Sequence, residues 1–321
     1  MLDLSPDEHA LLSLHQAVAA SGYAFTTPTP ATHARVNFRA QTQGAEEART
    51  IRDVFGWSRP FQESVLPPAV FGLAMQAGVL EPSAQGWRST VRFSTLGHRL
   101  YVHSAYPTSA ADAVFFGPDT YRFANAIAAL PPRSTNRPAG RAVDIGCGAG
   151  PGAIAAIDHL EPAEVYAADI NDRALAYTRV NAAAARVAVT AIHSNLLGGL
   201  SGEFDLIVAN PPYLVDAAER AYRHGGGPLG AGLSLAILEA ACTRLAPGGT
   251  LLLYTGAAIL GGADLFREAV QNRLAGAELT WSYREVDPDV FGEEVAEGAY
   301  TEADRIAAVV LTVQKKEKHD A

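Results

Sequence analysis

The second half of the chain alternates short apolar runs with longer segments of helical composition. The runs are apolar at most positions and rich in β-branched residues, which is typical of strands buried on both faces of a sheet. Because such strands alternate with helices, the pattern predicts a parallel α/β sheet. Two later runs, 279–286 and 305–314, have no clear helix between them and predict an antiparallel hairpin that closes one edge of the sheet. The other predicted strands cover residues 141–145, 164–169, 187–192, 204–209 and 250–255.

The first 130 residues show a mixed pattern. Residues 5–22 begin with a serine N-cap candidate and acidic residues and then keep an apolar spacing of three and four, so they predict a helix. Residues 66–80 predict another helix, and the alternating stretch 87–105, with a Leu-Gly turn, predicts a hairpin. The Pro-, Ser- and Gly-containing stretch 131–140 is typical of a linker. We therefore expect a small α+β domain over 1–130, winged-helix-like and suited to substrate recognition, and a larger α/β domain over 131–321.

Composition narrows the classes of function. The chain is 48% apolar and 18% charged, as soluble globular proteins are. Its net charge of −9 is unfavourable for holding nucleic acid by phosphate neutralisation alone, although it leaves a local basic patch open. Two cysteines, Cys147 and Cys242, are too few for a zinc site or a disulfide framework. With neither a signal-peptide pattern nor an apolar stretch of about 18 residues, we expect a cytoplasmic protein without metal or membrane partners.

A glycine-rich turn, VDIGCGAGPG (143–152), follows the first predicted strand of the α/β sheet and precedes a helix. Its glycines Gly146, Gly148 and Gly150 can adopt positive φ and allow the backbone to approach a ligand closely. The N–H groups at the start of the next helix are unpaired and available to that ligand. Alone, such a turn is compatible with a dinucleotide or with another adenosine cofactor.

The next two strand ends carry further candidates for the cofactor site. Asp169, in AADIND, stands where a carboxylate can accept hydrogen bonds from ribose hydroxyls, and Ile170 beside it is assigned to the same site. The alternative role of Asp169, a helix N-cap, suits Asp172 better. At the end of the third strand, Asn195 is expected to bind the adenine amino group and Leu196 to pack on the ring, although this stretch is also a plausible turn.

The fourth strand, FDLIVA (204–209), ends in Asn210-Pro211-Pro212-Tyr213. The prolines have no N–H groups and fixed φ, which leaves backbone carbonyls available as acceptors. The Asn210 side chain adds a second acceptor, and Tyr213 offers a flat face for a planar target. Two acceptors can hold an –NH₂ group whose lone pair is delocalised and favour the positive charge that develops as it attacks an electrophilic methyl group. The arrangement therefore predicts chemistry on a planar amino nitrogen.

DIGCGAGPG, AADIND and ANPPYL, in this order, resemble the class I S-adenosylmethionine-dependent methyltransferases, and within them the HemK/PrmC-like family with a "methyltransferase small domain". The resemblance covers about 112–314 and makes 131–321 the methyltransferase domain. It implies a Rossmann-like sheet of about seven strands in the order 3-2-1-4-5-7-6, the last antiparallel. It also implies that Asp144, Gly146 and Gly148 line the methionine part of S-adenosylmethionine. Asp119 and Thr120, in a stretch similar to the family's Pro-Glu-Thr-like segment, are expected either to contact this cofactor or to cap a helix.

The acceptor is less well specified. The mixed N-terminal region and the segment after Tyr213 depart from the pattern of release-factor glutamine methyltransferases, and Asn195 replaces their usual acidic residue. We favour a protein glutamine amide, in a release-factor-like substrate, over an exocyclic amine of adenine or guanine in RNA or DNA. The nucleic-acid alternative has support only if Arg220, Arg223 and His224 contact phosphate rather than form a solvated face. An NAD-dependent oxidoreductase, or a binding module without catalysis, would leave Asn-Pro-Pro-Tyr without a role.

Overall fold

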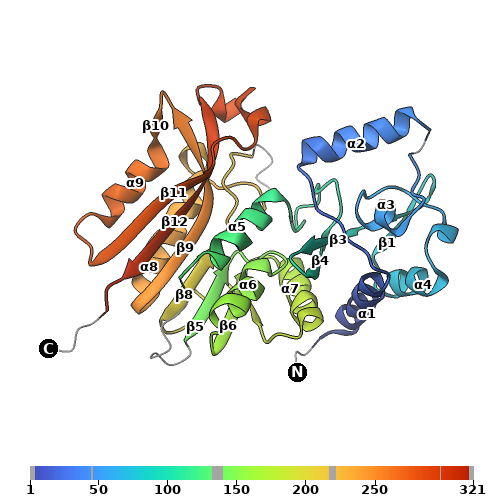
Figure 1. Cartoon of the computed structure of the whole chain (residues 1–321), viewed down its shortest axis with the longest axis horizontal. Helices are drawn as coiled ribbons and strands as arrows, with labels where there is room; N and C mark the ends of the chain where they lie inside the picture. Colours follow the sequence, from blue (N-terminus) through green and yellow to red (C-terminus); the bar gives the residue numbers. More distant parts are fainter. Residues whose placement is uncertain (1–3, 45, 132–139, 217–221, 297, 318–321) are drawn as a thin grey trace.

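The computed structural model describes residues 4–44, 46–131, 140–216, 222–296 and 298–317. A twisted central sheet dominates the second half of the chain (Figure 1). Its main strands follow one another in the order β7 (Thr190–His193), β6 (Glu164–Asp169), β5 (Arg141–Ile145), β8 (Phe204–Ala209), β9 (Leu245–Leu260), β12 (Arg305–Lys315) and β11 (Leu279–Asp287), with the short β10 (Ala263–Asp264) paired to β9.

The strand directions confirm the α/β prediction. Strands β5 to β9 pair in parallel, whereas β12 pairs antiparallel with both β9 and β11. Numbered along the sheet, this order is 3-2-1-4-5-7-6 with an antiparallel last strand, as the resemblance implied. The predicted hairpin is therefore formed, with its second strand inserted between the first strand and the rest of the sheet.

Helices cover both faces of the sheet. On one face, a buried cluster joins Phe123 and Ile127 to strand residues such as Leu206; on the other, Ile237 and Phe266 pack against residues such as Leu253. The first face carries α5 (Pro118–Ala128), α6 (Pro151–Leu160) and α7 (Asp172–Ala185), and the second carries α8 (Gly232–Arg244) and α9 (Leu265–Leu274). This is the layered arrangement expected when parallel strands have apolar residues on both faces.

The N-terminal region is a smaller α+β unit, as predicted. It contains α1 (Pro6–Ala20), α2 (Pro30–Thr42), α3 (Ile51–Phe55), α4 (Pro68–Gln76) and the antiparallel pairs β1 (Leu80–Ser83) with β2 (Gly86–Ser89) and β3 (Val91–Leu96) with β4 (Arg99–Ser104). This region also contains the short 3₁₀ turn η1 (Glu63–Val65). Three further 3₁₀ turns lie in the sheet half: η2 (Pro228–Gly230), η3 (Gly292–Ala296) and η4 (Gly298–Tyr300). Helices α2 and α3 were not predicted, because neither has a regular apolar stripe.

The N-terminal region packs on the outer side of α6 and α7. One buried cluster combines Leu14 and Phe93 with Ile154 of α6 and Val180 of α7. The buried amide of Asn181 on α7 accepts from Val102 N at 2.8 Å and donates to Val102 O at 3.0 Å, which ties β4 to the sheet half. The predicted linker lies almost wholly outside the described residues, so the domain boundary stays a prediction.

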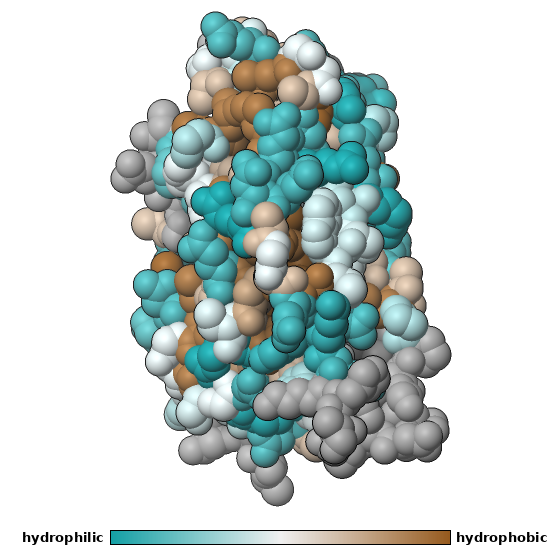
Figure 2. Space-filling view, turned by 90° about the vertical axis from the view of Figure 1, so that its left-hand side faces the viewer, coloured by the Kyte–Doolittle hydropathy of each residue, from teal (hydrophilic) through white to brown (hydrophobic). Residues whose placement is uncertain are grey.

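The surface on the side of β11 and α9 is mostly polar. Seen from the side of β11 and α9, hydrophilic residues cover most of the face and hydrophobic residues show between them (Figure 2). Within the described ranges, no helix combines the length and apolar character needed to cross a bilayer.

Candidate active site

A cavity of about 390 Å³ opens at the carboxyl ends of β5, β6, β7 and β8. Ligands of open α/β sheets bind at this edge, beside the point where the strand order reverses. All predicted site residues except Gly150 line the cavity: Asp119, Thr120, Asp144, Gly146, Gly148, Asp169, Ile170, Asn195, Leu196, Asn210, Pro211, Pro212 and Tyr213. Their contacts with a cofactor or an acceptor stay predictions.

The glycine turn has the predicted backbone conformation. Gly146 and Gly148 have φ values of 69° and 55°, and a Cβ on Gly146 would meet no atom within 4 Å. This open space is where a ligand could approach the backbone. Gly150 has φ 82° at the N-cap of α6 and faces Thr178, whose side chain would lie 3.0 Å from an added Cβ. The absence of a side chain at Gly150 therefore allows α6 to pack closely on α7. Gly150 does not line the cavity, so its contact with the cofactor stays a prediction without support from the cavity.

Asp169 holds the glycine turn from the neighbouring strand. Its carboxylate accepts hydrogen bonds from Gly148 N at 3.0 Å and from Asn171 N at 2.9 Å. Burial raises the pKa of Asp169, and these N–H groups oppose the increase. Asn171, and not Asp172 as expected, caps α7 by accepting from Arg173 N at 3.0 Å. The expectation was wrong by one residue, because the asparagine side chain reaches the first free N–H groups while Asp172 is already helical.

Ile170 stands out among the cavity residues because its side chain is apolar and 55% exposed. A large aliphatic side chain that faces an open cavity can pack on a flat ligand, which would remove this apolar surface from water. Leu196 lines the same cavity and has a φ of 51°, in the left-handed region that non-glycine residues rarely adopt.

The loop after β7 is fixed by a residue that the sequence analysis missed. The hydroxyl of Ser194 donates to Leu196 O at 2.9 Å and accepts from Gly199 N at 2.9 Å. These bonds hold Leu196 in its unusual conformation and leave Asn195 exposed beside the cavity. Ser194 directly precedes Asn195, but nothing in its local pattern distinguishes it from a turn residue.

Asn210 lies where β8 ends, half-buried in the cavity wall. Its side-chain amide makes no hydrogen bond to any other residue in the described ranges. The backbone that follows is braced by Tyr300, whose hydroxyl accepts from Val215 N at 3.0 Å and donates to Tyr213 O at 3.4 Å. The corner is thus rigid, while the Asn210 amide remains available to a ligand.

Tyr213 is buried and its hydroxyl is hydrogen-bonded, so it differs from an exposed aromatic platform. Its hydroxyl donates to Asp119 Oδ2 at 2.7 Å, and the hydroxyl of Tyr254 on β9 donates to Oδ1 of the same carboxylate at 2.7 Å. Arg122 also donates to Oδ1 at 3.2 Å and pairs with Asp287 at 2.6 Å. Both oxygens of Asp119 therefore have protein donors. This network could not be predicted, because a tyrosine inside the apolar run TLLLYT (250–255) resembles an ordinary core residue.

Thr120 and Asp144 brace helix starts at the floor of the cavity. Helix α5 has Gly117 as its N-cap, and Thr120 Oγ1 accepts from Gly117 N at 3.2 Å, so neither Asp119 nor Thr120 is itself the N-cap. Asp144 Oδ2 accepts from Ala153 N at 2.9 Å in the first turn of α6. Burial raises the pKa of Asp144 to about 8, against the effect of that N–H group.

The outer part of the cavity has an aromatic wall that the sequence analysis missed. Phe115 and Tyr222 stack with ring centroids 6.2 Å apart and an interplanar angle of 15°, and Phe291 lies edge-on to Tyr213 at 5.9 Å. Tyr106 lines the same cavity from the N-terminal region. These residues come from three separated segments, which follow β4, β8 and β11, so only the fold brings them together.

The basic residues near the corner are only partly described. Arg220 lies outside the described residues, and His224 Nδ1 accepts from Asp216 N at 3.1 Å. Arg223 forms an ion pair with Glu294, and its Nε lies 3.6 Å from Asp216 Oδ1. Two carboxylates therefore compete with any phosphate for this guanidinium. The described part of the chain holds no group of three or more His, Cys, Asp or Glu residues suited to a metal ion.

Comparison with known proteins agrees with this geometry. Residues 127–275 match the family model of the methyltransferase small domain. The release factor glutamine methyltransferase of Deinococcus radiodurans is 36% identical over 48% of this chain and 55% of its own length. Ribosomal RNA small subunit methyltransferase C of Chromohalobacter salexigens is 35% identical over 39% of this chain and 34% of its own length. The ribosomal protein uL3 glutamine methyltransferase of Neisseria gonorrhoeae is 34% identical over 36% of this chain and 42% of its own length.

The chain thus spans about half the length, or less, of these relatives. The matched region contains the glycine turn, the carboxylate after β6 and the Asn-Pro-Pro-Tyr corner, on a sheet with the class I methyltransferase strand order. Residues 127–275 of this chain are therefore similar to the methyltransferase small domain family.

Proposed function

We propose that this protein transfers a methyl group from S-adenosylmethionine to a planar amino nitrogen of a macromolecule. The observation that carries the proposal is the position of Asn210. Its amide has no partner among the described residues and faces the same cavity as the glycine turn and Asp169. A hydride-transfer enzyme would need the glycine turn but would have no use for this corner.

The residues present fit the cofactor. Asp169 retains acceptor capacity for ribose hydroxyls beside its two backbone bonds, since a carboxylate has about four lone-pair positions. Ile170 and Leu196 supply apolar surface for the adenine ring, and Asn195 lies beside them for its amino group. The open space at Gly146 would receive the methionine part. When bound, S-adenosylmethionine supplies an electrophilic methyl group on a positively charged sulfur.

At the acceptor, the Asn210 carbonyl and a backbone carbonyl of the proline pair would accept the two N–H bonds of the amino group. These contacts orient the nitrogen lone pair and strengthen as positive charge develops on the nitrogen, so they favour the transition state over the ground state. One N–C bond forms as the S–C bond breaks, and the nitrogen then loses a proton to water. Tyr213, held by Asp119, keeps the corner in place.

The acceptor belongs to one of two classes, both with a planar amino group. A glutamine amide agrees with the substrates named for two of the relatives above, and a nucleobase agrees with the RNA named for the third. The stacked Phe115 and Tyr222, with Phe291, favour a nucleobase, because a base offers a larger flat face to an aromatic wall than an amide does. Either acceptor fits the expected cytoplasmic location.

Labelling with tritiated S-adenosylmethionine tests the proposal. A lysate of cells that lack this protein is incubated with the wild-type protein or with Asn210→Ala, and samples are then digested with protease or with ribonuclease. We expect label with the wild type and at least about 100-fold less with the variant. Release by ribonuclease identifies a base in RNA, and release by protease identifies an amide. Absence of label despite calorimetric binding of S-adenosylmethionine, or binding of NAD in its place, would overturn the proposal.

A further inference from the structure

Helix α2 presents a basic and aromatic face to solvent. Arg35, Phe38 and Arg39 lie on one side of the helix because they are spaced by three and four residues. All three are exposed, and Phe38, at 65%, is the most exposed large hydrophobic residue in the described part of the chain. The helix contains no acidic residue. We call these three residues the α2 face.

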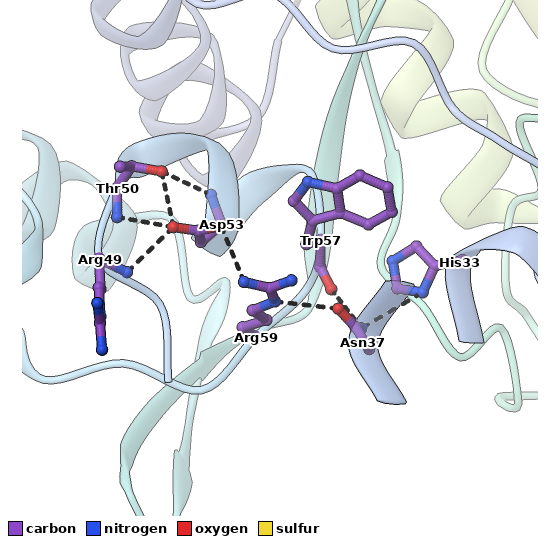
Figure 3. A network of polar contacts seen from close by, with 7 residues as sticks. All are labelled: His33, Asn37, Arg49, Thr50, Asp53, Trp57 and Arg59. Atoms are coloured by element: carbon purple, nitrogen blue, oxygen red, sulfur yellow. Dashed lines mark hydrogen bonds and ion pairs between the residues drawn. The ribbon is translucent and has the colours of Figure 1, made fainter. Parts of the chain in front are cut away.

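The opposite side of α2 is fixed to the rest of the N-terminal region (Figure 3). Asn37 donates to Trp57 O at 3.0 Å and accepts from Arg59 Nε at 3.0 Å, and Arg59 pairs with Asp53 of α3 at 3.2 Å. His33 is buried on this side against Trp57. Because the inner residues set the rotation of the helix, the α2 face points away from the molecule.

Arg35 and Arg39 are available to a ligand, whereas most arginines in the described part of the chain have a hydrogen-bond or ion-pair partner. Within the described ranges, the guanidinium groups of Arg35 and Arg39 have no hydrogen-bond or ion-pair partner. By contrast, Arg223 at the cavity pairs with carboxylates. Residues 30–59 contain five arginines and three carboxylates, against a net charge of −9 for the whole chain. This segment therefore carries a small local excess of positive charge.

Helix α2 begins at the wall of the cavity. Pro30, the first residue of α2, lines the cavity together with Tyr106. A helix of 13 residues is about 20 Å long, so the α2 face extends outward from the cavity mouth over the length of a few nucleotides. A flexible chain whose target group enters the cavity would pass along this helix.

We propose that the α2 face docks single-stranded RNA next to the nucleotide whose base enters the cavity. The proposal rests on the proposed function and selects the nucleobase as acceptor. Unpaired guanidinium groups bind phosphates, and an exposed aromatic ring between them stacks on a base without regard to its identity. The small number of cations suits a single strand better than a duplex, and the aromatic wall of the cavity suits an unstacked base.

Fluorescence anisotropy with a labelled 20-nucleotide single-stranded RNA of mixed sequence tests the docking. We compare the wild type with Arg35→Glu/Arg39→Glu, with Phe38→Ala, and with the control Arg186→Glu/Arg284→Glu. The control changes two exposed arginines away from α2 and makes the same change in net charge. The α2 reversal should weaken binding at least tenfold at about 0.1 M salt and lower the salt slope by about 1.4, since each lost phosphate contact contributes about 0.7. Phe38→Ala should weaken binding about fivefold or more.

The control variant should retain most of the affinity of the wild type. Equal binding by both double variants, or no salt-dependent RNA binding by the wild type, would overturn the docking proposal. Calorimetry with S-adenosylmethionine on each variant separates this outcome from failure of the proposed function, which would appear as loss of cofactor binding in the wild type itself. If circular dichroism shows that Arg35→Glu/Arg39→Glu is misfolded, the single variants Phe38→Ala and Arg39→Gln are used to test the docking instead, because both positions are exposed.

Discussion

The hydroxyl of Tyr213 donates a 2.7 Å hydrogen bond to the carboxylate of Asp119, which lies 94 residues earlier in the chain. Tyr254 makes the matching bond to the other carboxylate oxygen. Burial, and then the charge of Asp119, raises the pKa of both tyrosines, so both hydroxyls remain donors. Helix α5, which carries Asp119, thereby fixes the aromatic residue of the Asn-Pro-Pro-Tyr corner.

Tyr213→Phe and Tyr254→Phe form a matched pair, because each removes one hydroxyl donor from Asp119. Each should lower the free energy of unfolding by roughly 1.5–3 kcal/mol, as expected for a hydrogen bond to a charged group. Only Tyr213→Phe should slow methyl transfer, by about tenfold, because it releases a ring that borders the acceptor. Chemical unfolding and label incorporation measure the two effects. If both variants slow methyl transfer equally, the position of the Tyr213 ring is not the reason that this network affects methyl transfer.

Gly256→Ala should displace the same ring. A Cβ at Gly256 would lie 2.1 Å from the Cδ2 atom of Tyr213, so the ring or β9 must move. We expect a loss of about 1–3 kcal/mol in unfolding free energy and reduced methyl transfer. Gly72→Ala on α4, where an added Cβ meets nothing within 4 Å, is the control and should be neutral or slightly stabilising. A Gly256→Ala protein with wild-type activity would show that the ring tolerates displacement.

Asp169→Ala should weaken S-adenosylmethionine binding by roughly 10- to 150-fold, which corresponds to lost charged hydrogen bonds of about 1.5–3 kcal/mol. The substitution also frees Gly148 N, which loosens the glycine turn. Asp172→Ala, at an exposed carboxylate paired with His193, should leave the affinity unchanged. Calorimetry gives both constants. Similar affinities for the two variants would remove Asp169 from the cofactor site.

Acid should destabilise the N-terminal region. Burial lowers the pKa of His33 to about 3, with the charge of Arg92 as a second cause. The unfolded chain, with an ordinary value of about 6.5, therefore binds a proton that folded His33 does not, and the stability falls as the pH drops from about 6.5 toward 3. In His33→Gln, the slope of unfolding free energy against pH in this range should decrease by up to about 1.4 kcal/mol per pH unit. Urea unfolding at several pH values measures it, and an unchanged slope contradicts the prediction.

The α/β alternation of the sheet could be predicted because its signals are local, whereas the strand order was implied by the family resemblance. Apolar strands, the glycine turn and the Asn-Pro-Pro-Tyr corner are each contained in a few consecutive residues. Their positions at strand ends follow from the α/β alternation. This is why nearly all predicted site residues line one cavity.

The remaining features depend on tertiary contacts. Helix α2 buries only His33 and Ala40 fully, so its sequence has no apolar stripe to detect. The contacts of Asp119 with Tyr213 and Tyr254 span 94 and 135 residues. Asn171 and Asp172 are neighbours, and the cap of α7 is Asn171 because the helix begins at Asp172. Sequence patterns do not locate a helix boundary to within one residue.

The cavity has two kinds of wall. The sheet contributes the corner at Asn210, and the N-terminal region contributes Pro30 and Tyr106. Substitutions in the outer wall can therefore change which molecule enters without altering the atoms that react. A chimera that keeps the sheet half and exchanges the N-terminal region would accordingly keep the corner, with Tyr222 and Phe291, from one parent and take Pro30 and Tyr106 from the other.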